Sequence, residues 1–269
     1  MRQLAWTSRS VRFPFLASTL AAVVLMQAAS VFGASIIVNE YNAVDEWLDG
    51  ASGTATDTYF GRVEGNGGDW FELVVIQDHL DIRGWRVDIR EGGDNVDDEL
   101  VFTDHAIWSD LRSGTIITLA EDDNGGTLVD DISYDPAAGD WWINVMVNDS
   151  NGGTYITETN IKITDDKTRF EIVDDSNVTI FGPAGEGVQP TSGVNDEEVW
   201  KLEADPSDSI VPTSPEYNDG TSSTFGSPNI YGGGQEVQDF SELRAVVPEP
   251  GTLVLLACSA LALLMFRRR

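Results

Sequence analysis

The apolar residues between positions 34 and 247 fall into short runs separated by Gly, Asn and Asp. The runs are rich in β-branched and aromatic residues, which is typical of strands. None of them keeps a 3.6-residue apolar period over three turns, so no long amphipathic helix is expected. The pattern predicts strands at residues 36–41, 70–76, 84–90, 100–103, 115–120, 142–147, 161–164, 169–173, 178–181 and 199–202.

Two of these runs indicate how they lie in a sheet. In residues 84–90, apolar residues alternate with charged ones, so one face should pack on a core and the other should face water. Residues 70–76 are apolar on both faces except at Glu72, which indicates a central strand. Trp70 and Trp85 are expected in the core because each indole can bury a large area. Glu72 either anchors backbone N–H groups near a loop or faces solvent.

Turn residues between the runs predict hairpins. The Asp-Asp-Ser-Asn sequence at 174–177 predicts a four-residue hairpin connection between the strands on either side. The Asp-Asn-Gly-Gly sequence at 123–126 predicts a second hairpin between residues 115–120 and 128–132, because Asn and Gly accept the positive φ angles of such turns. Short strands at regular spacing with turns between them favour a sandwich or a barrel.

The last part of the body is poor in strand signals. Residues 206–234 are dense in Pro, Ser, Gly, Asp and Asn, which predicts an extended crossing. Residues 232–246 are expected to form a linker, with one short helical turn at 239–244.

The N-terminal residues have the composition of a targeting segment. Residues 1–12 contain three arginines and no acid, residues 13–26 are almost wholly apolar, and small residues follow. This order predicts a secretory signal peptide over residues 1–34, with an uncut N-terminal anchor as the alternative. The apolar run is too short for a comfortable membrane span.

The C-terminal residues have the composition of a second targeting segment. An uncharged apolar stretch at 252–266 is preceded by Pro-Glu-Pro and followed by three terminal arginines. A helix over 251–266 would span about 24 Å, short of the ~30 Å hydrocarbon core, so it predicts a weak transmembrane anchor with its arginines in the cytoplasm. The residues of this motif are Pro248, Glu249, Pro250, Arg267, Arg268 and Arg269.

This three-part end resembles the PEP-CTERM sorting signal of exopolysaccharide-producing bacteria. The resemblance implies recognition of the Pro-Glu-Pro by an exosortase, cleavage near it, and transient membrane anchoring through the C-terminal helix. The alternative is an ordinary C-terminal membrane anchor with a coincidental Pro-Glu-Pro. The sorting signal would occupy residues 247–269.

Five short motifs follow one another along the body: Ile37-Val38-Asn39-Glu40-Tyr41, Asp69-Trp70-Phe71-Glu72-Leu73, Leu80-Asp81-Ile82-Arg83-Gly84-Trp85, Ser113-Gly114-Thr115-Ile116 and Phe225-Gly226-Ser227-Pro228-Asn229. Their order resembles that of the lamin tail domain. The resemblance covers residues 36–230 in outline and implies an all-β, immunoglobulin-like β-sandwich over 35–231. Residues near 122–166 would then be an insertion that adds strands to the sandwich or forms a small subdomain.

The charge of the chain is unevenly placed. The formal net charge is −29, but both ends are basic, and residues 34–247 hold 10 basic and 44 acidic side chains, near −34. A body of this charge repels a phosphate backbone, which excludes a nucleic-acid partner, and it attracts cations. The only cysteine, Cys258, lies in the C-terminal apolar stretch, so the exported part can form no internal disulfide.

Catalytic motifs are absent from the sequence. His79 and His105 lie in no known catalytic pattern and are expected to be solvated or capping residues. There is no phosphate-binding Gly-rich loop. With 44 acids in the body, some carboxylate pairs arise by chance, so they are weak support for a hydrolase. We therefore predict that the protein is not an enzyme; a secreted polysaccharide hydrolase using two carboxylates is an alternative.

Acidic clusters at predicted turns suggest calcium, because hard cations prefer carboxylate and carbonyl oxygens in loops. The segment 149–153 begins like an EF-hand loop but lacks the third acid and the correctly placed Gly. The competing interpretation is that Asp and Asn are good turn formers on a solubilising surface. The candidate calcium ligands are Asp94, Asp97, Asp98, Asp122, Asp123, Asp149 and Asn151.

Adjacent indoles at Trp141 and Trp142 should point to opposite faces of a strand. One is expected in the core, and the other packs on a second layer or stacks on a sugar. The sequence as a whole predicts an exported, exosortase-processed protein of the cell surface or extracellular matrix. Its role would be structural or adhesive, with extracellular polysaccharide as a candidate partner. A calcium-dependent binding module is the alternative that the acidic turns favour.

Overall fold

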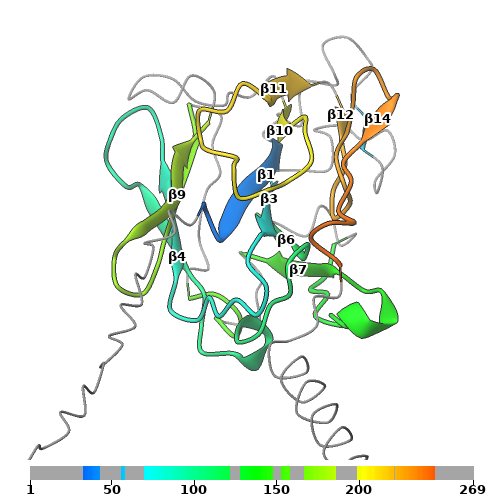
Figure 1. The fold of residues 1–269 in the computed structure, drawn as a ribbon. Helices are drawn as coiled ribbons and strands as arrows, with labels where there is room; N and C mark the ends of the chain where they lie inside the picture. The colour runs from blue at the N-terminus through cyan, green and yellow to red at the C-terminus, as the bar shows by residue number, and fades with distance from the viewer. Residues whose placement is uncertain are drawn as a thin grey trace, which may run out of the picture. The chain divides into compact units, whose positions relative to one another are not determined.

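The computed structural model describes residues 33–42, 56–57, 70–121, 128–147, 153–157, 167–185, 199–220 and 222–245. Within these ranges the regular structure is almost all β (Figure 1). The elements are β1 (Ile36–Asn42), β2 (Thr56–Asp57), β3 (Trp70–Val75), β4 (Arg86–Arg90), β5 (Asp98–Val101), η2 (Ala106–Trp108), β6 (Ile116–Ala120), η3 (Pro136–Ala138), β7 (Trp142–Met146), β8 (Arg169–Val173), β9 (Thr179–Ala184), β10 (Val199–Leu202), β11 (Tyr217–Gly220), β12 (Ser222–Ser223), β13 (Ile230–Tyr231) and β14 (Glu236–Val237).

The larger sheet has six strands in the order β11-β10-β1-β3-β6-β7. All neighbours are antiparallel except β6 and β7, which are parallel. The apolar run that begins at Trp70 is indeed central, because β3 lies between β1 and β6 and is buried throughout. β7, which lies within residues 122–166, extends this sheet at one edge.

The smaller sheet has four antiparallel strands in the order β5-β4-β8-β9. The predicted hairpin between β8 and β9 is confirmed. Its turn is closed by the Asp174 N–H, which donates to the Val178 carbonyl over 2.9 Å. Asn177 takes the positive φ of 64° that the turn requires, a conformation in which Asn is favoured over most other residues.

Aromatic side chains join the two sheets. Phe170 of β8 contacts Tyr41 of β1 and Phe71 of β3, with ring centroids 4.9 and 4.6 Å apart. These rings belong to a single apolar core with residues from both sheets. The two larger sheets are therefore packed against each other as two β-layers, with β12-β2 and β13-β14 as two further two-stranded sheets, and the prediction of an all-β fold is confirmed.

Three local predictions need correction. Residues 128–132 do not form a hairpin with β6; they run beside β7, where Asp131 forms an isolated bridge with Asn144. Asp88, expected to face water, is only 4% exposed because the Arg86 guanidinium covers it at 2.8 Å. Trp85 packs against the core but is only partly buried, whereas Trp70 is fully buried as expected.

The C-terminal part of the body is packed more closely than its composition suggests. The span expected to be a linker, 232–246, contains β14, and Gln238 and Phe240 are each 4% exposed. The helical turn expected at 239–244 is present, since the Arg244 N–H donates to the Phe240 carbonyl at 2.9 Å.

Several predicted segments lie outside the described residues: the signal peptide, the strand at 161–164 and the sorting signal. In the part of the chain that the structure does describe, no helix is long and apolar enough to span a membrane.

Candidate functional site

A row of polar side chains crosses the larger sheet. Strand register places Lys201 beside Glu40, Glu40 beside Glu72, Glu72 beside Thr118, and Thr118 beside Asn144. We call these five residues, from β10, β1, β3, β6 and β7, the polar row. Each is no more than 2% exposed. Burial of this many polar groups is costly unless every one is hydrogen-bonded, so what covers them decides the stability of the sheet.

The polar row lies on the face of the sheet turned away from the smaller sheet. Successive residues of a strand point to opposite faces. Tyr41 and Phe71, which directly follow Glu40 and precede Glu72, contact Phe170 of the smaller sheet. Figure 1 shows β12 and β14 on the other side of β1 and β3 from β4 and β9. The C-terminal residues 222–245, which we call the cap, therefore cover the polar row.

The cap presents its backbone to the charged members of the row. The Glu40 carboxylate accepts hydrogen bonds from the Thr224 N–H at 3.1 Å and from the Thr224 hydroxyl at 2.7 Å. The Lys201 ammonium donates to the Ser222 and Ile230 carbonyls at 2.7 and 2.8 Å. Charge-assisted bonds of this kind are about twice as strong as neutral ones.

Glu72 has the first of the two roles expected for it. Its carboxylate accepts from the Gly226 N–H at 3.0 Å and from the Asn39 side-chain amide at 2.7 Å. Gly226 has a φ of +67°, and a Cβ at this position would lie 2.4 Å from the Trp142 ring. Only glycine allows the backbone to come this close, which explains a glycine at the centre of the cap.

Three amide side chains extend the network beyond the row. Asn229 of the cap donates to the carbonyls of Asn39 and Leu202 at 3.1 and 3.0 Å, and its side-chain oxygen accepts from Asn39 at 3.2 Å. Gln238 donates to the side chain of Asn39 at 2.9 Å and accepts from the Asn229 N–H, also at 2.9 Å. These bonds join residues 190 and 199 positions apart in the chain.

Apolar contacts seal the other end of the row. Phe225 of the cap meets Trp70 and Trp142 edge-on, with ring centroids 5.0 and 5.6 Å apart. The Trp142 indole N–H donates to the Thr118 hydroxyl at 3.0 Å, and Thr118 donates to the Asn144 side chain at 2.7 Å. Trp142 is thus a packing residue, but neither it nor Trp141 is fully buried, so the expectation of one indole in the core needs correction.

The polar row was not predicted, although a signal for it exists. Four of the five strands contain a single polar residue within an apolar run, and that residue belongs to the row; β1 contains three, Asn39, Glu40 and Asn42, so the pattern alone does not say which of them joins it. Chemically the row is closed: its two carboxylates accept hydrogen bonds from the cap, Glu72 also accepts one from Asn39 of β1, and both are 0% exposed. It is built to hold the cap, not to reach a substrate.

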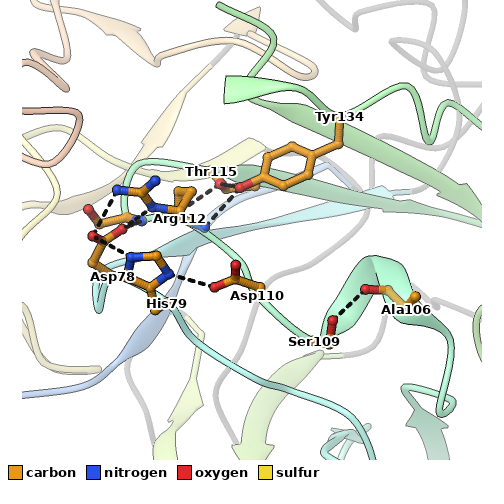
Figure 2. A network of polar contacts seen from close by, with 9 residues as sticks. Asp78, His79, Ala106, Ser109, Asp110, Arg112, Thr115 and Tyr134 are labelled. Atoms are coloured by element: carbon orange, nitrogen blue, oxygen red, sulfur yellow. Dashed lines mark hydrogen bonds and ion pairs between the residues drawn. The ribbon is translucent and has the colours of Figure 1, made fainter. Parts of the chain in front are cut away.

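A second polar network lies in the loops between β3 and β6 (Figure 2). The His79 ring sits between two carboxylates, with Nδ1 at 2.7 Å from Asp110 and Nε2 at 3.6 Å from Asp78. The Arg112 guanidinium donates two hydrogen bonds to the Asp78 carboxylate, of 2.6 and 3.0 Å. The Tyr134 hydroxyl accepts from the Arg112 N–H at 2.8 Å.

The charged groups of this network hold the loops together. Burial raises the pKa of Asp78, but the hydrogen bonds from Arg112 and from the Ser113 N–H outweigh it and leave the pKa below its ordinary 3.8. The same hydrogen bond to Asp78 raises the pKa of Arg112 above its ordinary value. Both groups are partly exposed, so their pairing contributes modestly to stability.

The other residues singled out from the sequence have structural partners. His105 caps η2, because its Nδ1 accepts from the Ile107 N–H at 3.2 Å. Trp141 is partly buried, with the Arg244 guanidinium 5.1 Å from its ring centroid.

The structure describes only part of the acidic clusters proposed for calcium. Asp97 accepts from the Glu91 N–H at 2.9 Å, and Asp94 lies 3.6 Å from the Arg169 guanidinium. Among the described residues, no group of three or more His, Cys, Asp or Glu side chains is placed to hold a metal ion. Four of the candidates lie outside the described residues: Asp122, Asp123, Asp149 and Asn151.

Comparison with known proteins places a family signature at the C-terminus. The searches of curated proteins and of solved structures gave no significant match. The resemblance of the body to the lamin tail domain is not supported by a family match. Residues 246–269 match the PEP-CTERM protein-sorting motif, which implies recognition by an exosortase and an exported, membrane-anchored precursor.

Proposed function

We propose that the chain is an exported protein that an exosortase cleaves near Pro248-Glu249-Pro250 and that then serves a structural or adhesive role at the cell surface or in the extracellular matrix. The observation that carries the proposal is the match of residues 246–269 to the PEP-CTERM protein-sorting motif. The body has a net charge near −34. This charge agrees with a soluble domain outside the cell, because self-repulsion opposes aggregation.

The closed polar row supports a structural role over a hydrolytic one. A glycosidase needs two carboxyl groups that face a substrate cleft. Glu40 and Glu72 are the neighbouring carboxylates of the row, yet both are fully buried and bonded to the cap. A polysaccharide chain could reach them only after the cap had been removed, and the sheet would then lose the partners of its buried charges.

The lamin-tail-like, immunoglobulin-like identity of the body is part of this proposal. Its support is that the motifs behind the resemblance contact one another: Asn39 and Glu72, from the first two, bond to each other and to Asn229 and Gly226 of the closing motif. Motifs far apart in sequence thus form one structural unit. Calcium and extracellular polysaccharide stay predictions.

Mass spectrometry of the mature protein tests the central claim. In cells that contain an exosortase, the C-terminal peptide should end near Pro-Glu-Pro and lack the terminal arginines. Glu249→Ala should accumulate full-length precursor, whereas Glu242→Ala, a matched change at an exposed acid seven residues upstream, should be processed normally. Recovery of wild-type protein with an intact Arg267-Arg268-Arg269 end from such cells would rule out the proposed processing.

A further inference from the structure

The last described residues of the chain are docked on the body just before the sorting signal begins. The Arg244 guanidinium donates to the Gly114 carbonyl through Nε and Nη2, at 3.0 and 2.9 Å. Its carbon lies 4.6 Å from the Phe240 ring centroid and 5.1 Å from that of Trp141, within cation–π range. One arginine thus clamps the end of the cap to two segments of the body.

The surrounding residues are shaped for this contact. Gly114 has a φ of +81°, and a Cβ there would lie 2.7 Å from Arg244 Cγ. The Ser113 hydroxyl donates to the Leu243 carbonyl at 2.5 Å. Phe240, 4% exposed, belongs to the main core. The segment 238–244 is therefore held by apolar burial of Phe240, by the Ser113 hydroxyl and by the charge-assisted fork from Arg244 to Gly114.

Chain length then limits how far the sorting motif can lie from the folded body. Three residues, Ala245, Val246 and Val247, separate Arg244 from Pro248. Fully extended, this stretch places the Cα atom of Pro248 at most about 14 Å from that of Arg244. A protein that binds a peptide in extended form contacts several consecutive residues, so it needs free chain beside the motif.

We propose that docking of segment 238–244 restrains cleavage: the exosortase gains full access to Pro248-Glu249-Pro250 only when Arg244 leaves Gly114 and the segment lifts from the body. The inference rests on the proposed function, since it concerns the same sorting signal. The folded body then slows cleavage of its own sorting signal, and the strength of the Arg244 contacts sets the cleavage rate.

Pulse–chase of the full-length chain in cells with an exosortase measures that rate as conversion of precursor to shortened product. Arg244→Ala removes the fork and the stacking and should speed conversion by about tenfold, the factor that loss of one hydrogen-bonded charged group brings. Arg244→Lys, which cannot form the planar fork, should fall between Ala and wild type. Arg83→Ala, the same charge change at an exposed arginine paired with Asp81, should match wild type.

A spacer variant keeps the test independent of folding. Six Gly/Ser residues inserted between Ala245 and Val246 leave every described contact in place but free the motif, so they should also speed conversion. A wild-type or slower rate in the spacer variant, or in an Arg244→Ala protein that is exported and stable, overturns the inference. If neither wild type nor variants are cut, the proposed function itself fails, which is a different result.

Discussion

Glu72→Gln is the sharpest test of the polar row, because it changes one oxygen to an amide without changing the shape of the side chain. The donors to this carboxylate include the Gly226 N–H and the Asn39 amide. A glutamine has one acceptor oxygen, so its NH₂ group must face one of these donors. The variant loses a charge-assisted hydrogen bond and leaves a donor–donor contact in a site with no access to water.

The expected cost follows from these two terms. Hydrogen bonds to charged groups contribute about 1.5–3 kcal/mol, and a buried group left without its partner costs about 1–3 kcal/mol. Asn39 keeps other acceptors, Asn229 and Gln238, at 3.2 and 3.3 Å. The amide oxygen should therefore turn to Gly226, and the penalty should lie near the lower ends of both ranges combined, about 2–4 kcal/mol.

Urea unfolding of the purified exported protein measures this penalty as a lower midpoint with an unchanged slope. Glu99→Gln is the matched control, because this carboxylate is 52% exposed and lies 3.3 Å from the Arg86 guanidinium; its loss should cost at most about 1 kcal/mol. Equal stability of the two variants would refute the claim that the cap is held by buried charge.

Further predictions concern the cap, the loops and the acidic turns. Gly226→Ala should cost clearly more stability than Gly233→Ala in thermal unfolding, because both glycines have positive φ but only the first would clash, with Trp142. Since the pKa of Asp78 is lowered below 3.8, its stabilising effect exists above that pH and is lost as the pH falls through the lower, folded-state pKa; Asp78→Asn should thus be less stable than wild type at neutral pH and equal to it in strong acid. If the acidic turns bind calcium, millimolar calcium should raise the melting temperature and a chelator should reverse the shift, whereas no shift would remove that hypothesis.

The strands were predictable because burial on both faces of a central strand leaves a plain apolar signature. β3, β6 and β10 all lie within or close to the predicted runs. The polar row was not predictable, because its alignment depends on register. A bulge between Val38 and Glu40 sets which β1 residues face the cap. A shift of one residue would have turned Glu40 toward the aromatic core.

Much of the cap escaped prediction for a different reason. Its composition of Gly, Ser, Pro and Asn is that of a linker, and apart from the closing motif at 225–229 and the helical turn at 239–244 the local sequence contains little sign that it folds. What orders it is a set of acceptors and donors contributed by strands nearly 200 positions away, such as Asn39 bonding to Gln238. Partners of this kind become visible only once the sheet is assembled.

That same separation dictates when the fold can close. The bonds from Thr224 to Glu40 join residues 184 positions apart. Until the cap has been synthesised, Glu40 and Glu72 lack the hydrogen bonds that Thr224 and Gly226 donate, and burying their charges without these bonds would cost several kcal/mol each. Closure must therefore wait for the C-terminal end of the body, and long-range closure of this kind is slow. The sorting signal directly follows the cap in the sequence, so the residues that complete the fold and the residues of the sorting motif are synthesised one after the other. The buried polar row therefore closes at about the stage at which the sorting signal is synthesised.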